Sequence, residues 1–375
     1  MNETEDYNRN FSHSLRMTKK CDHRDFEEVT KIAMTFSYSL LLIIAFLGNA
    51  FVISVARRRL TVRNPFNILI INLSVCDILY ATTAVTIQVY YIFFRISWFP
   101  GGFGIFLCKM KEFAFVLSIA TSILTLTFMA IEKHLAILYV MKTPLSTRNV
   151  CRAILFIWLV SSVIASTELI KLTVVLLPNQ THVSCFPMWS RNDTEAYTFY
   201  KVEYTIRFFL LFVFPLLVMI VLYGRIIRYL WQRQLPGNRS NKNERKIRMQ
   251  SRRAVLMLVT MTVVFAVGWF PVHVNHYLIF YEQLNFCLPH YLILVLYWMA
   301  HANCAVNPCL YLIFNKDYND EFKKLFKCHG RYTLYRQRCG TIEGADGLLR
   351  VPAMGSDTRR ESIPLRTRST TFRKH

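Results

Sequence analysis

Charged side chains are missing from seven long stretches of this 375-residue chain, within which Asp77 is the only charge. The stretches are 32–56, 66–94, 113–131, 153–167, 208–224, 254–281 and 283–315. A helix needs roughly 20 apolar residues to cross a bilayer, and its backbone groups must be satisfied within the segment. With 53% hydrophobic residues overall, the chain is therefore no ordinary soluble domain, and we predict seven membrane-spanning helices.

Recognisable catalytic motifs are also missing. The chain has no zinc-binding histidine pair on a helix, no nucleophile elbow and no phosphate-binding glycine loop, so nothing in it supports an enzyme. A transporter would be expected to show internal repeats and a path of charges at mid-membrane depth, and neither is visible. A multi-pass transporter or channel is therefore the weaker alternative class.

Lysine and arginine are scarce on one side of the expected helices. The segments after spans one, three and five hold 17 of them, whereas the segments on the other face hold 7. This asymmetry predicts a plasma-membrane protein with its N-terminus outside. The N-terminal MNETEDYNRN has no signal-peptide core, so the first span is expected to direct insertion. Most of the net charge of +22 is then expected on cytoplasmic segments that face anionic lipid. No nucleic-acid partner is expected.

The sites of extracellular modification agree with this orientation. Four glycosylation sequons begin at residues on the expected outer face, namely Asn2, Asn10, Asn179 and Asn192. Cys108 and Cys185 also fall outside, in an oxidising compartment, so we predict a disulfide between them. Cys21 and Cys287 lie outside as well and form a second candidate pair.

Each expected span also carries a short distinctive motif. In chain order these are GNAFV at 48–52, NLSVCD at 72–77, Trp98 before FGIFLCK, Trp158, Pro215 with Tyr223, FAVGWFP at 265–271 and NPCLY at 307–311. With this set the chain resembles the rhodopsin-like (class A) G-protein-coupled receptors over about residues 30–328. The resemblance implies an all-α seven-transmembrane bundle at 31–315, after an extracellular tail at 1–30. An amphipathic cytoplasmic helix at 316–328 and a disordered tail at 329–375 are expected to follow.

The resemblance also implies a sodium site and a set of moving residues. Four positions match those that hold a sodium ion in such receptors, namely Asp77, Ser122, Asn303 and Asn307; no other cofactor is expected. Oxygen ligands suit a hard cation, although Asp77 could instead be a structural polar group. The matched moving parts are Tyr223, Phe265, Trp269, Pro271, Pro308 and Tyr311. The alternative for the prolines is a static kink.

Two family chemistries are excluded by missing residues. Phe115 stands where monoamine receptors carry an aspartate, and His301 stands where opsins carry the retinal lysine. A wide polar cavity instead predicts a peptide ligand, lined by Gln88, Glu112, Phe115, Glu203, Arg207, His273, His276, Tyr297 and His301. Gln88 and the Trp98 loop resemble the neuropeptide branch. Glu112 and Arg207, with Glu168, either contact an amidated, arginine-containing peptide, or pair with one another or extend to the membrane interface.

The third span ends with Glu132, Lys133 and His134 where the family usually has Asp-Arg-Tyr. Lysine keeps the positive charge but loses the planar fork of arginine. The acid that often locks this position from span six is also missing, so Glu132 is the expected partner of Lys133. A tolerated substitution in a working receptor is favoured; the alternative is a scaffold or decoy with weak G-protein coupling.

The expected partners on the inner face follow from the same resemblance. A heterotrimeric G protein would enter a cavity opened by movement of span six. Arrestin and receptor kinases would act on the tail, where Ser362 lies in a basic kinase-like sequence and Cys328 is a candidate palmitoylation site. The residues 314–326 place apolar side chains on one helical face, which indicates a helix lying on the bilayer surface.

Overall fold

The computed structural model describes residues 27–58, 65–94, 97–138, 145–176, 182–190, 192–232, 242–281 and 288–325. The chain divides into two units, Met1–Lys324 and Leu325–His375, and the description below concerns the first. Within it, seven helical segments are long and apolar enough to cross a membrane, which confirms the predicted class of fold.

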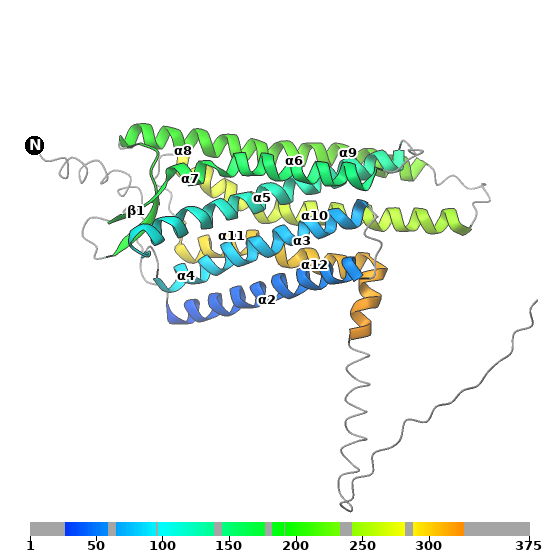
Figure 1. Cartoon of the computed structure of the whole chain (residues 1–375), viewed down its shortest axis with the longest axis horizontal. Helices are drawn as coiled ribbons and strands as arrows, with labels where there is room; N and C mark the ends of the chain where they lie inside the picture. The colour runs from blue at the N-terminus through cyan, green and yellow to red at the C-terminus, as the bar shows by residue number, and fades with distance from the viewer. Residues whose placement is uncertain are drawn as a thin grey trace, which may run out of the picture. The chain divides into compact units, whose positions relative to one another are not determined.

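Three of the seven spans begin and end as continuous helices, and four are built from shorter pieces (Figure 1). The continuous ones are α2 (Glu28–Arg58), α5 (Gly101–Leu138) and α10 (Lys242–Tyr281). Span two joins α3 (Pro65–Tyr80), a wide turn at Ala81–Val85 and α4 (Thr86–Phe94); span four joins α6 (Thr147–Ala165) and α7 (Thr167–Lys171). Span five joins α8 (Asp193–Phe208), a wide turn at Phe209–Val213 and α9 (Phe214–Gln232), and span seven joins α11 (His290–His301) and α12 (Asn303–Phe314).

Spans three, four and five are longer than the uncharged stretches predicted, and span three runs over Gly101–Leu138. Span four runs over Thr147–Lys171 and span five over Thr194–Gln232, because both helices continue into polar and charged turns. The segment 225–232 and the start of α10 are helical, so spans five and six both extend into basic sequence. The residues 316–325 form a further helix in which Tyr318 is fully buried and Phe322 packs edge-on against Phe51 of α2.

A two-stranded hairpin covers one end of the bundle, which is called the hairpin end below (Figure 1). The antiparallel strands are β1 (Leu172–Leu176) and β2 (Val183–Pro187), with Val174 opposite Cys185. A disulfide joins Cys185 to Cys108 near the start of α5, as predicted. The backbone amide of Trp98 also donates a 2.7 Å hydrogen bond to the Val183 carbonyl. The hairpin is therefore fixed to the bundle at two points.

Buried polar groups link the helices to one another. Asn72 of α3 donates to Thr125 of α5 at 2.9 Å and accepts a 2.9 Å hydrogen bond from the Trp158 indole of α6. Buried side chains of this kind must be hydrogen-bonded, because an orphaned polar group in an apolar interior costs free energy. The three helices are thus fixed together through one asparagine.

Helices α2 and α12 approach each other unusually closely. A Cβ added at Gly48 would lie 2.8 Å from Pro308 Cγ, so only glycine fits there. Pro308 has no amide hydrogen and cannot donate to the Cys304 carbonyl one turn earlier. The Asn49 amide of α2 donates to that carbonyl at 2.9 Å. The neighbouring helix thereby supplies the hydrogen bond that the proline removes.

Candidate functional site

The four residues expected to bind sodium line one small cavity of about 40 Å³ in the middle of the bundle. Asp77 is 4% exposed, and the Asn307 amide nitrogen donates to its carboxylate at 2.9 Å. The Asn303 amide nitrogen donates to the Ala300 carbonyl at 2.8 Å. Both amides thus point their nitrogens at protein acceptors, so their oxygens remain available as ligands for a cation.

This donor set fits a hard monovalent cation. It combines one carboxylate, the Ser122 hydroxyl and amide oxygens, all of them oxygen ligands. Within the described part of the chain no three His, Cys, Asp or Glu side chains gather, so no site of the kind that transition metals prefer is formed there.

A series of aromatic rings borders this cavity and connects it to Phe115 of α5. Trp269 of α10 lies 6.3 Å from Phe265 and 6.5 Å from Phe115 of α5, measured between ring centroids. Phe115 continues to Tyr80 at 5.6 Å. Trp269 and Phe265 also line the Asp77 cavity. A displacement of α10 at Trp269 would therefore change the packing both around the cavity and at Phe115.

The expected ligand residues on α10 and α11 form a second group beside these rings. Tyr204 of α8 contacts His273 at 2.5 Å and stacks on His276 at a centroid distance of 4.8 Å. Tyr297 lies 3.4 Å from the His276 ring nitrogen. His301 is only 3% exposed, enclosed by tyrosine rings that include Tyr297. His273, His276 and Tyr297 are thus brought together, whereas His301 is buried in the interior of the bundle. Gln88 lies half-buried in α4.

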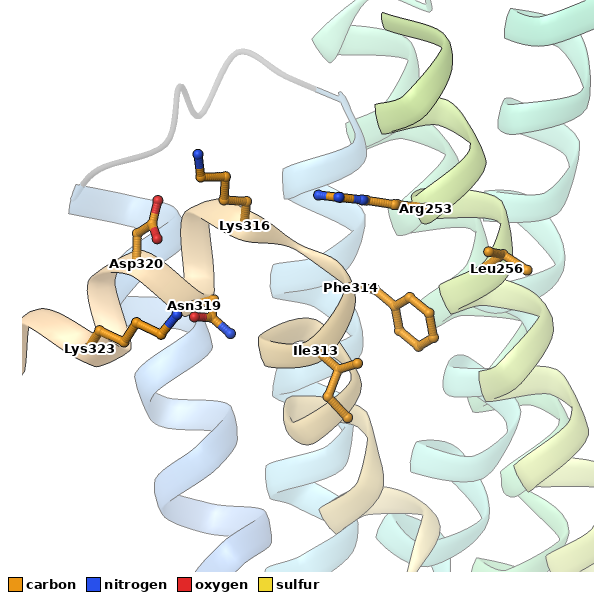
Figure 2. A pocket seen from close by; sticks show the side chains of 8 residues that line it. All are labelled: Arg253, Leu256, Ile313, Phe314, Lys316, Asn319, Asp320 and Lys323. Carbon is orange, nitrogen blue, oxygen red and sulfur yellow. The ribbon is translucent and has the colours of Figure 1, made fainter. Parts of the chain in front are cut away.

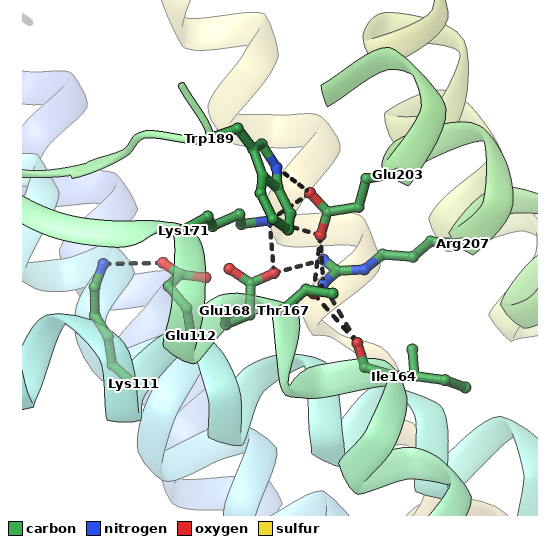
Figure 3. A network of polar contacts seen from close by, with 9 residues as sticks. All are labelled: Lys111, Glu112, Ile164, Thr167, Glu168, Lys171, Trp189, Glu203 and Arg207. Carbon is green, nitrogen blue, oxygen red and sulfur yellow. Dashed lines mark hydrogen bonds and ion pairs between the residues drawn. The ribbon is translucent and has the colours of Figure 1, made fainter. Parts of the chain in front are cut away.

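Glu203 and Arg207 of α8 belong to a buried ion cluster with Glu168 and Lys171 of α7 (Figure 3). Arg207 lies 2.5 Å from Glu168 and 2.7 Å from Glu203, and Lys171 lies 2.9 Å and 2.8 Å from the same two carboxylates. The Trp189 indole donates to Glu203 at 2.9 Å. Two acids and two bases, each at most 19% exposed, thus balance one another.

Glu168 and Arg207 therefore pair with each other, which is one of the alternatives that the sequence left open. The contact of Arg207 with Thr167 of α7 adds to the same cluster. Lys171, Thr167 and Trp189 were not among the expected site residues. The spacing could have indicated two of the links, because Glu168 and Lys171 stand at i,i+3 and Glu203 and Arg207 at i,i+4.

Glu112 of α5 stands apart from this cluster. Its side chain is 32% exposed and pairs with Lys111 at 2.9 Å. Lys111 is itself held by the Tyr91 hydroxyl at 2.7 Å and by the Trp98 ring at 4.8 Å. Glu112 is therefore more accessible than the carboxylates of Glu168 and Glu203, at 5% and 12%.

At the other end of the bundle, where α2 ends at Arg58 and α12 at Phe314, Lys133 pairs with Glu132 at 2.9 Å. This end is called the tail end below. The Lys133 ammonium also lies 3.8 Å from the centre of the Phe66 ring of α3, a favourable cation–π contact. His134 is 5% exposed, and Tyr223 and Tyr311 are also buried. Lys133 thus has the partner that the sequence suggested and a second one that it did not.

Several expected modification sites lie outside the described residues. They are Asn2, Asn10, Asn179, Cys328, Ser362 and the Cys21–Cys287 pair. Asn192 is described and exposed, and its side chain caps α8 by accepting from the Thr194 amide at 3.1 Å. The disulfide between Cys108 and Cys185 is present.

Seven spans, a disulfide-anchored hairpin at one end and a buried carboxylate cavity linked to aromatic rings define a seven-helix receptor of the membrane. The model of the 7 transmembrane receptor (rhodopsin family) matches residues 48–311. The chain belongs to this family and is a multi-pass membrane protein.

Individual relatives are 28% to 29% identical to the chain over the aligned residues. The Pyroglutamylated RF-amide peptide receptor of Rattus norvegicus is 28% identical over 78% of this chain and 69% of its own length. Galanin receptor 2b of Danio rerio is 29% identical over 79% of this chain and 75% of its own length. The Tachykinin-like peptides receptor 99D of Drosophila melanogaster is 28% identical over 76% of this chain, which spans 55% of that receptor.

Proposed function

We propose that the chain is a plasma-membrane receptor for an extracellular peptide that signals through a heterotrimeric G protein. The observation that carries the proposal is the similarity, over more than three quarters of the chain, to proteins named as receptors for peptides. The proposal assigns no reaction to the chain.

The hairpin end faces outside in this proposal and the tail end faces the cytoplasm. The excess of lysine and arginine on the segments after spans one, three and five supports that orientation. It places the exposed Asn192 sequon and the disulfide in the oxidising, glycosylated compartment.

Glu112 is the carboxylate that we assign to a basic group of the peptide. It is the most exposed of the three acids that could serve, and its ion pair with Lys111 can open toward a stronger cation such as arginine. Glu168, Glu203 and Arg207 would instead fix the wall between spans four and five. An amidated, arginine-containing peptide fits this division of roles.

Activation would move α10 outward at the tail end. Pro271 lies inside this helix, two residues after Trp269, and such a position can act as a hinge. The peptide would shift Phe115 and the His273–His276 group, and Trp269 would carry that displacement along α10 to the Asp77 cavity. The moved helix would uncover the surface around Lys133 for the C-terminal helix of a G protein.

Asp77, Ser122, Asn303 and Asn307 would hold a sodium ion, which when bound would compensate the buried carboxylate. A sodium ion that binds one arrangement of the bundle more tightly would stabilise that arrangement. It would then lower the affinity for a peptide that prefers the other arrangement, because coupled binding free energies are reciprocal. Arrestin and receptor kinases would act on the tail beyond the described residues.

Expression in cells, followed by a panel of neuropeptides, tests the proposal. G-protein dissociation and arrestin recruitment are read separately, and an amidated, arginine-containing peptide is expected to elicit both. Responses to a lipid or an amine, with none to any peptide, would overturn the peptide assignment. Peptide binding with arrestin recruitment but without G-protein dissociation would favour the scaffold or decoy.

Glu112→Gln keeps the size of the side chain and removes its charge. We expect it to weaken the potency of the active peptide by roughly tenfold, as loss of one interfacial charge pair does. Glu195→Gln is the matched control, because Glu195 is an exposed acid of the hairpin end whose partner is Ser190. Equal potencies for both variants would remove Glu112 from the binding site.

A further inference from the structure

A groove of about 470 Å³ lies at the tail end between α10 and the junction of α12 with the 316–325 helix (Figure 2). It is called the α10–α12 groove here. Its lining residues from α10 are Arg253 and Leu256, those from α12 are Ile313 and Phe314, and those from the following helix include Lys316 and Lys323. Figure 2 shows Arg253 extending from α10 toward the turn that precedes Lys316.

The charge of the α10–α12 groove is not balanced. Arg253, Lys316 and Lys323 face a single lining carboxylate, Asp320. In the part of the chain that the structure describes, none of the three cations has a carboxylate within ion-pair distance. Lys324, which does not line the groove, pairs with Glu321 at 2.6 Å. The groove therefore presents an excess of positive charge to an incoming ligand.

The apolar side of the groove is open. Leu256 is 45% exposed and Ile313 is 69% exposed, and both belong to membrane-spanning segments. Span seven ends at Phe314, and Arg253 lies within the first two turns of span six. The groove is thus apolar where the hydrocarbon of the bilayer ends and basic where the headgroups begin.

We propose that the α10–α12 groove binds one anionic phospholipid of the adjoining leaflet. Its phosphate would lie among Arg253, Lys316 and Lys323, and an acyl chain would run along Leu256 and Ile313. Positive charge beside an open apolar wall at headgroup depth suits this amphiphile better than a soluble anion, which would leave the wall uncovered. A shared headgroup would also tie α10 to the end of α12.

Native mass spectrometry of the full-length receptor in detergent tests the proposal, with phosphatidylserine and phosphatidylcholine titrated separately. The double variant Arg253→Gln/Lys316→Gln is expected to weaken phosphatidylserine binding roughly 10- to 30-fold, since each basic residue near the surface contributes to lipid attraction. Phosphatidylcholine binding should not change. Arg252→Gln/Lys324→Gln is the matched control, because it removes two neighbouring cations that do not line the groove.

Equal phosphatidylserine affinities for the two double variants would overturn the site. Binding of soluble glycerophosphoserine as tight as that of the lipid would overturn the role of the apolar wall, because the headgroup alone would then suffice. The measurement needs neither peptide nor G protein. The lipid-binding proposal rests on the membrane-spanning fold and not on the proposed function. The lipid site can therefore be disproved while the peptide receptor function stands, or be supported while that function fails.

Discussion

At the scale of single residues, the buried charges at the two ends of the bundle are held in ion pairs and an aromatic contact. Arg207 and Lys171 neutralise Glu168 and Glu203, and Lys133 is held between Glu132 and the Phe66 ring. Such pairs cost desolvation to bury but are expensive to break, because removal of one member strands the other.

Arg207→Ala should destabilise the receptor by about 3 kcal/mol or more, since it leaves Glu168 and Glu203 sharing one cation. We expect the midpoint of thermal unfolding in detergent to fall by several degrees. Lys31→Ala is the control, because its partner Glu28 is 79% exposed and such surface pairs contribute about 0 to 1 kcal/mol. A loss of peptide potency at an unchanged midpoint would instead make Arg207 a ligand contact.

Lys133→Arg tests whether the unusual end of span three limits signalling. Lys133 already has an ionic and an aromatic partner, so we expect agonist-stimulated G-protein dissociation to change by no more than about twofold, which corresponds to roughly 0.4 kcal/mol. The cation–π contact with Phe66 can be kept by arginine. A many-fold gain on this substitution would show that the natural lysine weakens coupling.

At the scale of elements, the sequence predicted the helices well and their lengths less well. Uncharged stretches located all seven spans. Spans three, four and five continue beyond these stretches, because a helix needs no apolar side chains once it leaves the membrane. The Cys108–Cys185 link was predicted from the outer position of both cysteines, a position that Cys21 and Cys287 share. The ion cluster was not, because Lys171, Trp189 and Glu203 come from three segments whose approach depends on the tertiary fold.

Gly48→Ala should separate α2 from α12, because the added methyl would overlap Pro308. Overpacking of this kind costs about 1 to 3 kcal/mol, which should appear as a lower midpoint of thermal unfolding. Gly224→Ala is the matched control: nothing lies within 4 Å of its Cβ position, and alanine favours the helix. Equal midpoints for the two variants would mean that the contact relaxes without cost.

At the scale of the whole molecule, the distribution of charge sets how the receptor sits in the membrane. Its net charge of +22 is concentrated on the segments after spans one, three and five and on the tail. The same bias brings cations to the α10–α12 groove, while Glu168, Lys171, Glu203 and Arg207 at the hairpin end balance one another.

Epitope tags at the two ends of the chain test this orientation. A tag before Met1 should be labelled by antibody on intact cells, whereas one after His375 should require permeabilisation, since lysine- and arginine-rich segments stay cytoplasmic. Both tags are fused to the same receptor, so each serves as the control for the other. Labelling of the C-terminal tag on intact cells would reverse the assignment.

The hydrogen bond from Asn49 to the Cys304 carbonyl makes one peptide group of α12 a natural vibrational probe. Its oxygen accepts from a side chain of α2, so its stretching frequency depends on the distance between two helices and not only on the helix that contains it. A ¹³C=¹⁸O label at Cys304 would move this band out of the amide envelope. The infrared spectrum would then report, without any attached fluorophore, whether α2 and α12 part when an agonist binds.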